Sequence, residues 1–542
     1  MMAVALLAAV AGCSDDDTGN SDDPVGVVGI SMIILNPKSA EPGDTVVATA
    51  VLEGYATPGS FPSVSWTSDG GTFLTNGQTS VGWVAPTTSG VYRLTCKVTG
   101  GSNSDQLDTD VFVGTPALSV AGNAGEIQLI SASPDYYYLN TVPVEGAWDS
   151  STVYRVSSGT PGPVVLTQRV GAEFAFSNAL AYSACVINDS TNSSFTEDAL
   201  NVYLTDLASG IQISVTTDRS FADGTRRHQY RYPYFSPDQN WITYQGYLPH
   251  PQSGSVDTLD VFVYNIQTGE ETNVTSRDES GSRRRNVYPT YSTDFAWLVY
   301  VSDRASRDQW DLYGQKVTNG DVDTDPQNVV RMTTGGLIGL GPGETLGAAD
   351  MAWNPTQSIV AVVGASGSDG GLHLVQTNAS GATTTDVTEV GTSVIEFAWS
   401  ANGAVLAVSS LINSVSAGGT VNAVFTSTPS GVATKKYEAI MGDRIVDMVW
   451  SPDSRYLVYR VIRGNLSWFE LLDIDAGTAW TGPVVVTSTV GIGTRNAYAA
   501  KMSTAARYPA DNIIHYIQFD DTLTPSASPT IWTLDISGAV NP

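Results

Sequence analysis

Basic and aromatic residues gather in a few connecting segments of a chain that is otherwise strongly acidic. The candidate ligand-binding residues are Arg226, Arg227, His228, Arg231, His250, Arg283, Arg284, Arg285, Arg304, Arg307 and Trp310. A guanidinium fork recognises carboxylates through paired hydrogen bonds, and an indole ring stacks on sugars or side chains. This combination predicts a binding face for an anionic partner, either an acidic protein or a uronic-acid glycan.

A structural interpretation of the same arginines is the alternative. Acidic residues lie in or beside the same segments, namely Asp223, Asp278, Glu279 and Asp308. Ion pairs with them would serve to order long loops. The two interpretations differ in one respect: replacing Arg283, Arg284 and Arg285 together by Ser would weaken ligand binding only under the first.

The residues that would carry enzymatic chemistry do not form a recognisable set. The nucleophile-elbow pattern Gly-x-Ser-x-Gly is absent, and the Gly-rich segment 336–347 does not lead from a strand into a helix. The four histidines, His228, His250, His373 and His515, show no close metal-ligand spacing. We therefore predict no catalytic residue, no metal site and no cofactor.

The overall charge limits the class of partner. The chain has 54 acidic and 26 basic residues, for a net charge of −28. Nucleic-acid binding needs cations that neutralise phosphates, and electrostatic adhesion to anionic lipid has the same requirement. We expect no nucleic-acid partner and no electrostatic attachment to a membrane, and we expect a monomer.

One segment is repeated along most of the chain and organises it. Residues 232–244, YPYFSPDQNWITY, are typical of a strand, a Ser-Pro-Asp turn and a second strand. The repeats centre on Ser133, Ser177, Ser236, Ser292, Asn354, Ser400, Ser451 and Ser503, at intervals of 44 to 62 residues. An apolar run and a shorter fourth strand follow most of them. A β-type repeat of this period predicts an all-β fold with the blades of a β-propeller.

The composite pattern resembles the TolB-type propeller, the WD-like repeat of bacterial envelope proteins. It joins an aromatic-x-x-aromatic-Ser-Pro-Asp motif to an Asp-aliphatic-aromatic-aliphatic motif and a terminal Thr. The repeats at Tyr232, Tyr288 and Asp447 match it well. The resemblance covers residues 116–542 and implies a propeller that binds envelope proteins through one face and its central channel. Direct counting predicts eight blades, with six or seven as alternatives.

The ends of the repeat region predict how the ring closes. The last repeat, residues 497–538, has three recognisable strands, and an open sheet edge favours aggregation. The segment 116–122, PALSVAG, stands before the first repeat and has no partner of its own. We predict that it completes the last blade.

Residues 27–114 show a different β pattern, with turn residues every eight to twelve positions, which is typical of a β-sandwich. The segments SWTSDGGTF, VGWVAP and SGVYRLTCKVTG resemble bacterial immunoglobulin-like domains of the polycystic-kidney-disease type, with Trp66 in the place of the core tryptophan. The resemblance implies a spacer or an adhesive stalk.

The N-terminal residues predict export and lipid anchoring. Residues 1–12 contain an apolar run that is too short to span a bilayer and is typical of a signal peptide. The segment before Cys13 resembles a bacterial lipobox, which implies that Cys13 is lipidated. Residues 13–26 form an acidic tether without large apolar residues to bury. We predict an outer-membrane lipoprotein that faces the periplasm or the cell surface, attached by its lipid alone.

The other two cysteines, Cys96 and Cys185, lie in different predicted domains. Strand alternation places Cys96 on the apolar face of its strand. We predict two free thiols, with a disulfide between them as the alternative.

Two functions compete. The first is a non-catalytic, lipid-anchored scaffold whose propeller face binds an envelope protein or an anionic glycan. The second is a metal-dependent lyase that acts on acidic polysaccharide, since oligogalacturonate lyases carry related repeats and use histidine ligands. His228 and His250 fall near the basic face. Bound metal would distinguish the two.

Overall fold

The computed structural model describes the chain in separate stretches. They are residues 28–54, 62–100, 103–115, 117–120, 126–129, 136–140, 151–156, 164–170, 174–177, 181–188, 200–216, 229–249, 257–275, 285–306, 308–338, 351–364, 371–378, 381–387, 390, 393–451, 453–464, 466–475, 483–486, 490–491, 503–504, 513–518 and 530–536. Within them, every element is a β-strand except one 3-10 turn, η1 (Pro326–Asn328). The predicted all-β fold is confirmed. The predicted signal peptide and tether lie outside the described residues.

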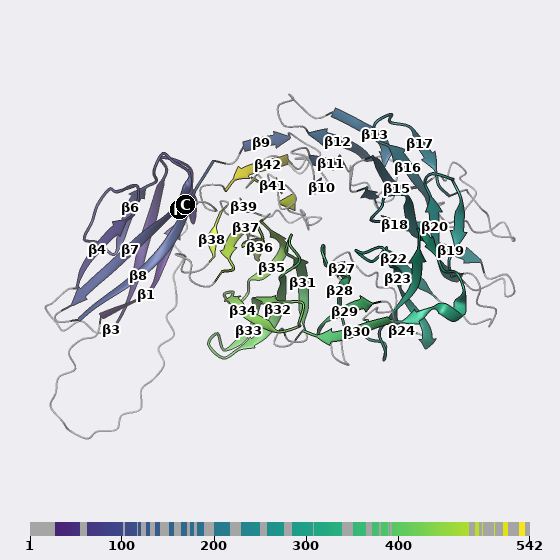
Figure 1. The fold of residues 1–542 in the computed structure, drawn as a ribbon. Coiled ribbons are helices and arrows are strands. Elements are labelled where there is room, and N and C mark those ends of the chain that lie inside the picture. The colour runs from purple at the N-terminus through teal and green to yellow at the C-terminus, as the bar shows by residue number, and fades with distance from the viewer. Residues whose placement is uncertain are drawn as a thin grey trace, which may run out of the picture.

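The first unit is a β-sandwich of two four-stranded sheets (Figure 1). One sheet has the order β1 (Val28–Asn36), β3 (Thr45–Gly54), β6 (Ser80–Val84), β5 (Thr72–Phe73). The other has the order β2 (Ser39–Ala40), β8 (Asn103–Val113), β7 (Gly90–Gly100), β4 (Ser63–Ser68). Alternate side chains turn inward because successive strand residues point to opposite faces. Trp66, Trp83 and Cys96 are buried in the core that the sheets share.

The rest of the described chain forms eight further sheets around a common axis, which is a β-propeller (Figure 1). Blade one comprises β10 (Glu126–Leu129), β11 (Tyr136–Asn140), β12 (Ser151–Val156) and β13 (Val164–Val170), and blade two comprises β14 (Phe174–Phe176), β15 (Tyr182–Asn188), β16 (Leu200–Asp206) and β17 (Gln212–Ser214). Blade three comprises β18 (Gln229–Phe235), β19 (Trp241–Pro249), β20 (Asp257–Asn265) and β21 (Glu271–Asn273). Blade four comprises β22 (Asn286–Tyr291), β23 (Trp297–Ser306) and β24 (Gln309–Thr318), and both β25 (Asp321–Val322) and β26 (Val330–Arg331) pair with β24. Blade five comprises β27 (Met351–Trp353), β28 (Ile359–Val363), β29 (Leu372–Asn378) and β30 (Gly381–Asp386). Blade six comprises β31 (Val394–Trp399), β32 (Leu406–Ser414), β33 (Gly419–Ser427) and β34 (Ala433–Glu438). Blade seven comprises β35 (Arg444–Trp450), β36 (Tyr456–Arg463), β37 (Leu466–Asp473) and β38 (Val484–Val485), and β39 (Val490–Gly491) also pairs with β37.

The eighth blade joins the two ends of the propeller sequence. It comprises β40 (Ser503–Thr504), β41 (Ile513–Gln518), β42 (Thr530–Asp535) and, from the start of the region, β9 (Ala117–Val120). β9 runs antiparallel to β42, with Leu118 opposite Trp532. The count of eight and the predicted closing strand are therefore both confirmed.

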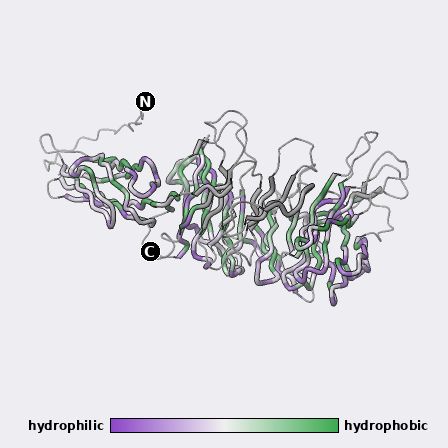
Figure 2. Tube along the Cα trace, turned by 90° about the horizontal axis from the view of Figure 1, so that it is seen from above, coloured by the Kyte–Doolittle hydropathy of each residue, from purple (hydrophilic) through white to green (hydrophobic). Residues whose placement is uncertain are grey.

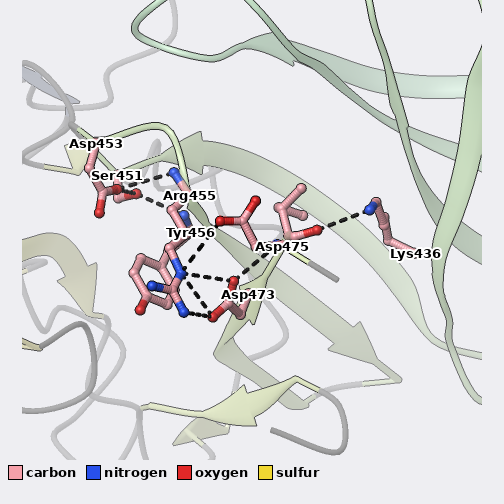
Figure 3. Close-up of polar contacts among 8 residues, drawn as sticks. Lys436, Ser451, Asp453, Arg455, Tyr456, Asp473 and Asp475 are labelled. Carbon is pink, nitrogen blue, oxygen red and sulfur yellow. Dashed lines mark hydrogen bonds and ion pairs between the residues drawn. The ribbon is translucent and has the colours of Figure 1, made fainter. Parts of the chain in front are cut away.

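The repeated serine has the same structural role in several blades. In the seventh, Ser451 Oγ accepts a hydrogen bond from the Tyr456 N–H at 2.9 Å and donates one to Asp453 (Figure 3). Asp453 in turn accepts the Arg455 N–H at 3.1 Å. The turn at Ser236 repeats all three contacts, as do those at Ser292 and, with Asn402 for the aspartate, Ser400. The Ser-x-Asp motif thus supplies side-chain acceptors for backbone N–H groups that have no strand partner in the tight turn.

The later Asp and Thr of the repeat also form one device. Asp311 is fully buried at the start of the third strand of blade four, and it accepts the Thr333 hydroxyl at 2.9 Å. Thr333 Oγ1 accepts the Leu312 N–H at 2.9 Å. Asp260 with Thr275 repeats this arrangement in blade three. The outer strand of these blades is therefore attached through side chains as well as through backbone pairing.

The sandwich packs against the edge of the ring and does not cover its axis (Figures 1 and 2). Phe112 of β8 is buried in a cluster with Tyr456, Phe469 and Leu534 of blades seven and eight. Lys38 Nζ lies 4.5 Å above the Trp468 ring. We call this contact the sandwich–propeller joint. It connects the sandwich to blade seven and to blade eight, which contains the closing strand β9.

Candidate functional site

The antiparallel order of each blade gives the propeller two unlike faces. The Ser-x-Asp turns join first strands to second strands at one end. Connections from second to third strands, and from each blade to the next, leave at the other end, which we call the loop face. The connections there are long: β17 ends at Ser214 and β18 begins at Gln229, and β21 ends at Asn273 before β22 at Asn286. Long loops on a rigid frame are where binding residues concentrate.

Arg285 is held by two acidic residues of blade four. Its Nη2 lies 2.7 Å from Asp303 Oδ2, its Nε donates to the same oxygen at 2.9 Å, and it also contacts Asp308. Its own N–H donates to Asp303 Oδ1 at 2.8 Å. Burial lowers the pKa of the guanidinium, but the hydrogen bonds and charges of Asp303 and Asp308 together more than offset this, so the pKa is raised. Arg285 is thus anchored to the β23–β24 hairpin.

Trp310 belongs to the same cluster. Its side chain is buried in the core between blades four and five, next to Ile338, and its backbone forms an isolated bridge with Ile338. Arg285 Cζ lies 4.4 Å above the ring. A cation on an aromatic face stabilises both groups. The face of Trp310 that we expected to stack on a ligand is in contact with Arg285.

Of the other predicted ligand-binding residues, the structure describes Arg231 and Arg304. Arg231 Cζ lies 5.1 Å from the ring centre of Tyr232, and Arg304 interacts with the Tyr300 hydroxyl. The remaining predicted residues lie outside the described parts of the chain; they are Cys13, Arg226, Arg227, His228, His250, Arg283, Arg284 and Arg307. The structure therefore joins Arg285 to Trp310 and leaves the other candidates as predictions.

The innermost strands of three blades share a backbone irregularity. Tyr232, Tyr288 and Asp447 have positive φ values of 55°, 54° and 55°, each at a shift in register between the first and second strands. The Tyr232 and Tyr288 rings lie 4.8 Å apart. The Tyr288 N–H donates to Gln245 Oε1 of the preceding blade at 3.0 Å. The bulge therefore frees a main-chain donor, which a side chain of the neighbouring blade accepts.

A charged version of this contact joins blades six and seven. Glu396 of β31 accepts the Met448 N–H at 3.1 Å and the Asp447 N–H, and Arg460 Nε lies 2.7 Å from Asp447 Oδ2. Burial, followed by the charge of Asp447, raises the pKa of Glu396 to about 7. This carboxyl changes its charge near neutral pH. We call Glu396, Asp447 and Arg460 the seam triad.

Our sequence interpretation missed the seam triad, although one signal was present. Asp447 stands where the other two well-matched repeats have Tyr232 and Tyr288. A carboxylate in an aromatic position needs a partner if it is buried. The sequence offered no means of choosing Arg460 or Glu396, because each lies on a different strand.

The two remaining cysteines and His373, which the sequence analysis also considered, lie within the packed strands of the structure. Cys96 and Cys185 are buried and are not in a disulfide within the described part of the chain, which confirms the predicted thiols. Burial raises the pKa of Cys96 to about 11. His373 Nδ1 lies 2.7 Å from Asp386 Oδ1. Among the described residues, no group of three or more His, Cys, Asp or Glu side chains is arranged to hold a metal ion. Within the same stretches, no helix has the length and apolarity needed to cross a bilayer.

No protein-family model matches the chain, and no curated protein matches it. Solved structures with related architecture include an oligogalacturonate lyase in complex with manganese, at 12% identity and a TM-score of 0.40, over 78% of this chain and 97% of that one. TolB from Acinetobacter baumannii has 14% identity and a TM-score of 0.31, over 64% of this chain and 75% of that one. A prolyl endopeptidase has 12% identity and a TM-score of 0.44, and this chain covers 55% of its length. Sequence identities and TM-scores this low say nothing about the activity of this chain.

Proposed function

We propose that the chain is a lipid-anchored, non-catalytic binding protein of the bacterial outer membrane. A TolB-type propeller is its binding domain, and its loop face holds a protein or an anionic glycan. An immunoglobulin-like sandwich separates this domain from the lipid. The strand order of the sandwich, with β1, β3, β6 and β5 in one sheet and β4, β7 and β8 in the other, supports the immunoglobulin-like part.

The observation that carries the binding role is the anchoring of Arg285. Its contacts with Asp303 and Asp308 hold the end of the basic connection against the β23–β24 hairpin. Arg283 and Arg284 directly precede this fixed point. A rigid support reduces the conformational entropy that the loop loses when a ligand binds. We therefore assign a structural role to Arg285 and partner binding to Arg283 and Arg284.

The test separates these two roles. We expect Arg283→Ser with Arg284→Ser to weaken binding to polyglutamate or polygalacturonate at least tenfold, with an unchanged melting temperature. Arg285→Ser should instead lower stability by about 1–3 kcal/mol, because it leaves the buried Asp303 without its cation. Binding is measured by calorimetry and stability by thermal unfolding.

Lys97→Ser provides the matched control, since it removes an exposed cation from the sandwich. Unchanged affinity for both polymers in the double variant would contradict a binding role for the basic connections.

The lipid anchor is tested separately in cells. We expect Cys13→Ser to abolish incorporation of labelled fatty acid and to move the chain from the membrane fraction to the soluble fraction. Cys96→Ser is the control, because that thiol is buried in the sandwich core. Equal labelling of both variants would rule out Cys13 as the anchor.

A metal-dependent lyase that acts on acidic polysaccharide is the second candidate. It is supported by His228 and His250, which fall in connections of the loop face, and His228 directly follows Arg226 and Arg227. Incubation with polygalacturonate and manganese should then give unsaturated products that disappear with a chelator. Binding of the polymer without any product would favour the first candidate.

A further inference from the structure

Large apolar side chains are exposed on the loop face of blades six and seven. Val415 at the tip of the β32–β33 hairpin is 99% exposed. Ile440 and Met441, in the connection between the blades, are 62% and 58% exposed, and Leu466 at the start of β37 is 44% exposed. We call these four residues the rim patch. Exposed apolar residues that cluster on one face mark interaction sites.

Specific contacts bring the three segments of the rim patch together. Met441 Sδ lies 3.2 Å from the position where a β-carbon of Gly419 would stand, and Gly419 pairs with Ser414 beside Val415. Arg463 Nη2 donates to Asp443 Oδ2 at 2.7 Å, and Arg463 pairs with Leu466. Both hairpins are thus tied to the connection that carries Ile440 and Met441.

The charges around the rim patch differ from those of the whole chain. Lys435 Nζ lies 2.6 Å from Glu438 Oε2, and Arg463 pairs with Asp443, so both local acids have cationic partners. Arg444, at the start of β35, is exposed, and no ion pair of its side chain lies within the described residues. This surface therefore has a small cationic surplus on a chain of net charge −28. An acidic partner is repelled by most of the molecule but is accepted here.

The two acids also make a polypeptide a better occupant than a bilayer. Glu438 accepts hydrogen bonds from Lys435 and from the Ser414 and Ser416 hydroxyls, which lower its pKa to about 2. Carrying an ionised carboxylate into hydrocarbon is costly. A polypeptide can instead cover the apolar residues while its own polar groups remain in contact with Glu438 and Asp443.

We propose that the rim patch docks a polypeptide segment in which apolar and acidic side chains are combined. The apolar side chains cover Val415, Ile440, Met441 and Leu466, and the carboxylates face Arg444. This inference rests on the proposed binding function, and it identifies the chemistry of the partner on a part of the loop face distinct from the basic connections of blades three and four.

The experiment uses the full chain and two labelled peptides of equal length. One alternates leucine with glutamate and the other alternates leucine with lysine. We expect the glutamate peptide to bind at least tenfold more tightly, as measured by fluorescence anisotropy. Ile440→Glu with Met441→Glu should weaken that binding at least tenfold. Val432→Glu is the matched control: Val432 is 64% exposed but lies at the opposite end of blade six.

Three results would overturn the inference. They are equal affinity for both peptides, unchanged affinity in the Ile440 and Met441 variant, and binding to phosphatidylcholine vesicles with the same sensitivity to this variant. Thermal unfolding of each variant verifies that it is folded. Polyglutamate binding that depends on Arg283 and Arg284 but not on the rim patch would leave the proposed function intact and refute only this inference.

Discussion

At the scale of single residues, charge in this propeller is used mainly in pairs that cross between elements. Arg285 reaches Asp303, Arg463 reaches Asp443, and Arg455 reaches Asp473 at 2.8 Å (Figure 3). In each pair the carboxylate is buried and the guanidinium is partly exposed. A buried carboxylate without its cation would be costly, so these arginines are structurally required.

The seam triad predicts a pH dependence of stability. Glu396 has a pKa of about 7 in the folded protein, above its ordinary value of 4.5. Between these values the folded state binds the proton more tightly than the unfolded state does, so stability falls as the pH rises through this window and then levels off. We expect Glu396→Gln to flatten this part of the profile. Melting temperatures between pH 5 and pH 8, measured by circular dichroism, provide the check.

Glu53→Gln, at an exposed position of β3, is the control for the same series. If Glu396→Gln retains the slope of the natural protein over this window, the assignment of a raised pKa to Glu396 is wrong.

At the scale of elements, several of the described blades are stabilised by side chains that satisfy backbone groups at the ends of their strands. The Ser-x-Asp turn closes the first pair of strands, and the Asp-Thr device attaches the fourth strand to the third. Trp450 Nε1 adds a bond to the Ala398 carbonyl of the preceding blade at 2.9 Å, and Trp399 repeats this with Ala352 at 3.2 Å. The repeat therefore encodes both the blade and its contact with a neighbour.

The serine of the turn gives a direct test at this scale. Ser451→Ala leaves the buried Tyr456 N–H without its acceptor and Asp453 without its donor. An unsatisfied buried donor costs about 1–3 kcal/mol. We expect a loss of that size in the free energy of unfolding in urea, whereas Ser430→Ala, at an exposed serine, should change it little. Equal effects of the two substitutions would show that the turn does not depend on the serine.

At the scale of the whole molecule, the sandwich and the closed ring form one unit. Only residues 114–116 separate β8 from β9, which completes the eighth blade. Phe112 at the end of β8 is buried among residues of blades seven and eight, and Lys38 stacks on Trp468. Trp468 Nε1 donates to Glu470 at 2.7 Å, and burial raises the pKa of this carboxyl. The joint therefore stabilises the ring beside its closing strand.

Truncation of Phe112 tests whether the joint supports ring closure. Phe112→Ala removes a buried aromatic side chain, and such changes typically cost about 3–5 kcal/mol. We expect a lower melting temperature together with faster proteolysis, because a loosened β9 exposes the edge of β42. Met32→Ala, at an exposed position of the sandwich, should leave both quantities unchanged. A stable, protease-resistant Phe112→Ala variant would show that the sandwich contributes little to closure.

The sequence by itself determined the repeat unit and pointed to eight blades, to the closing strand and to two cysteines outside any disulfide. These follow from patterns that are short in sequence: Ser451 acts on Tyr456 five residues away, and strand alternation buries Cys96. Only the tertiary structure decided that Arg285 is held by Asp303 and Trp310, that Glu396 meets Asp447, and that Phe112 enters the propeller. Each of these contacts joins different strands, blades or domains, and local sequence carries no information on which charged or apolar surfaces meet once the blades are arranged in a ring.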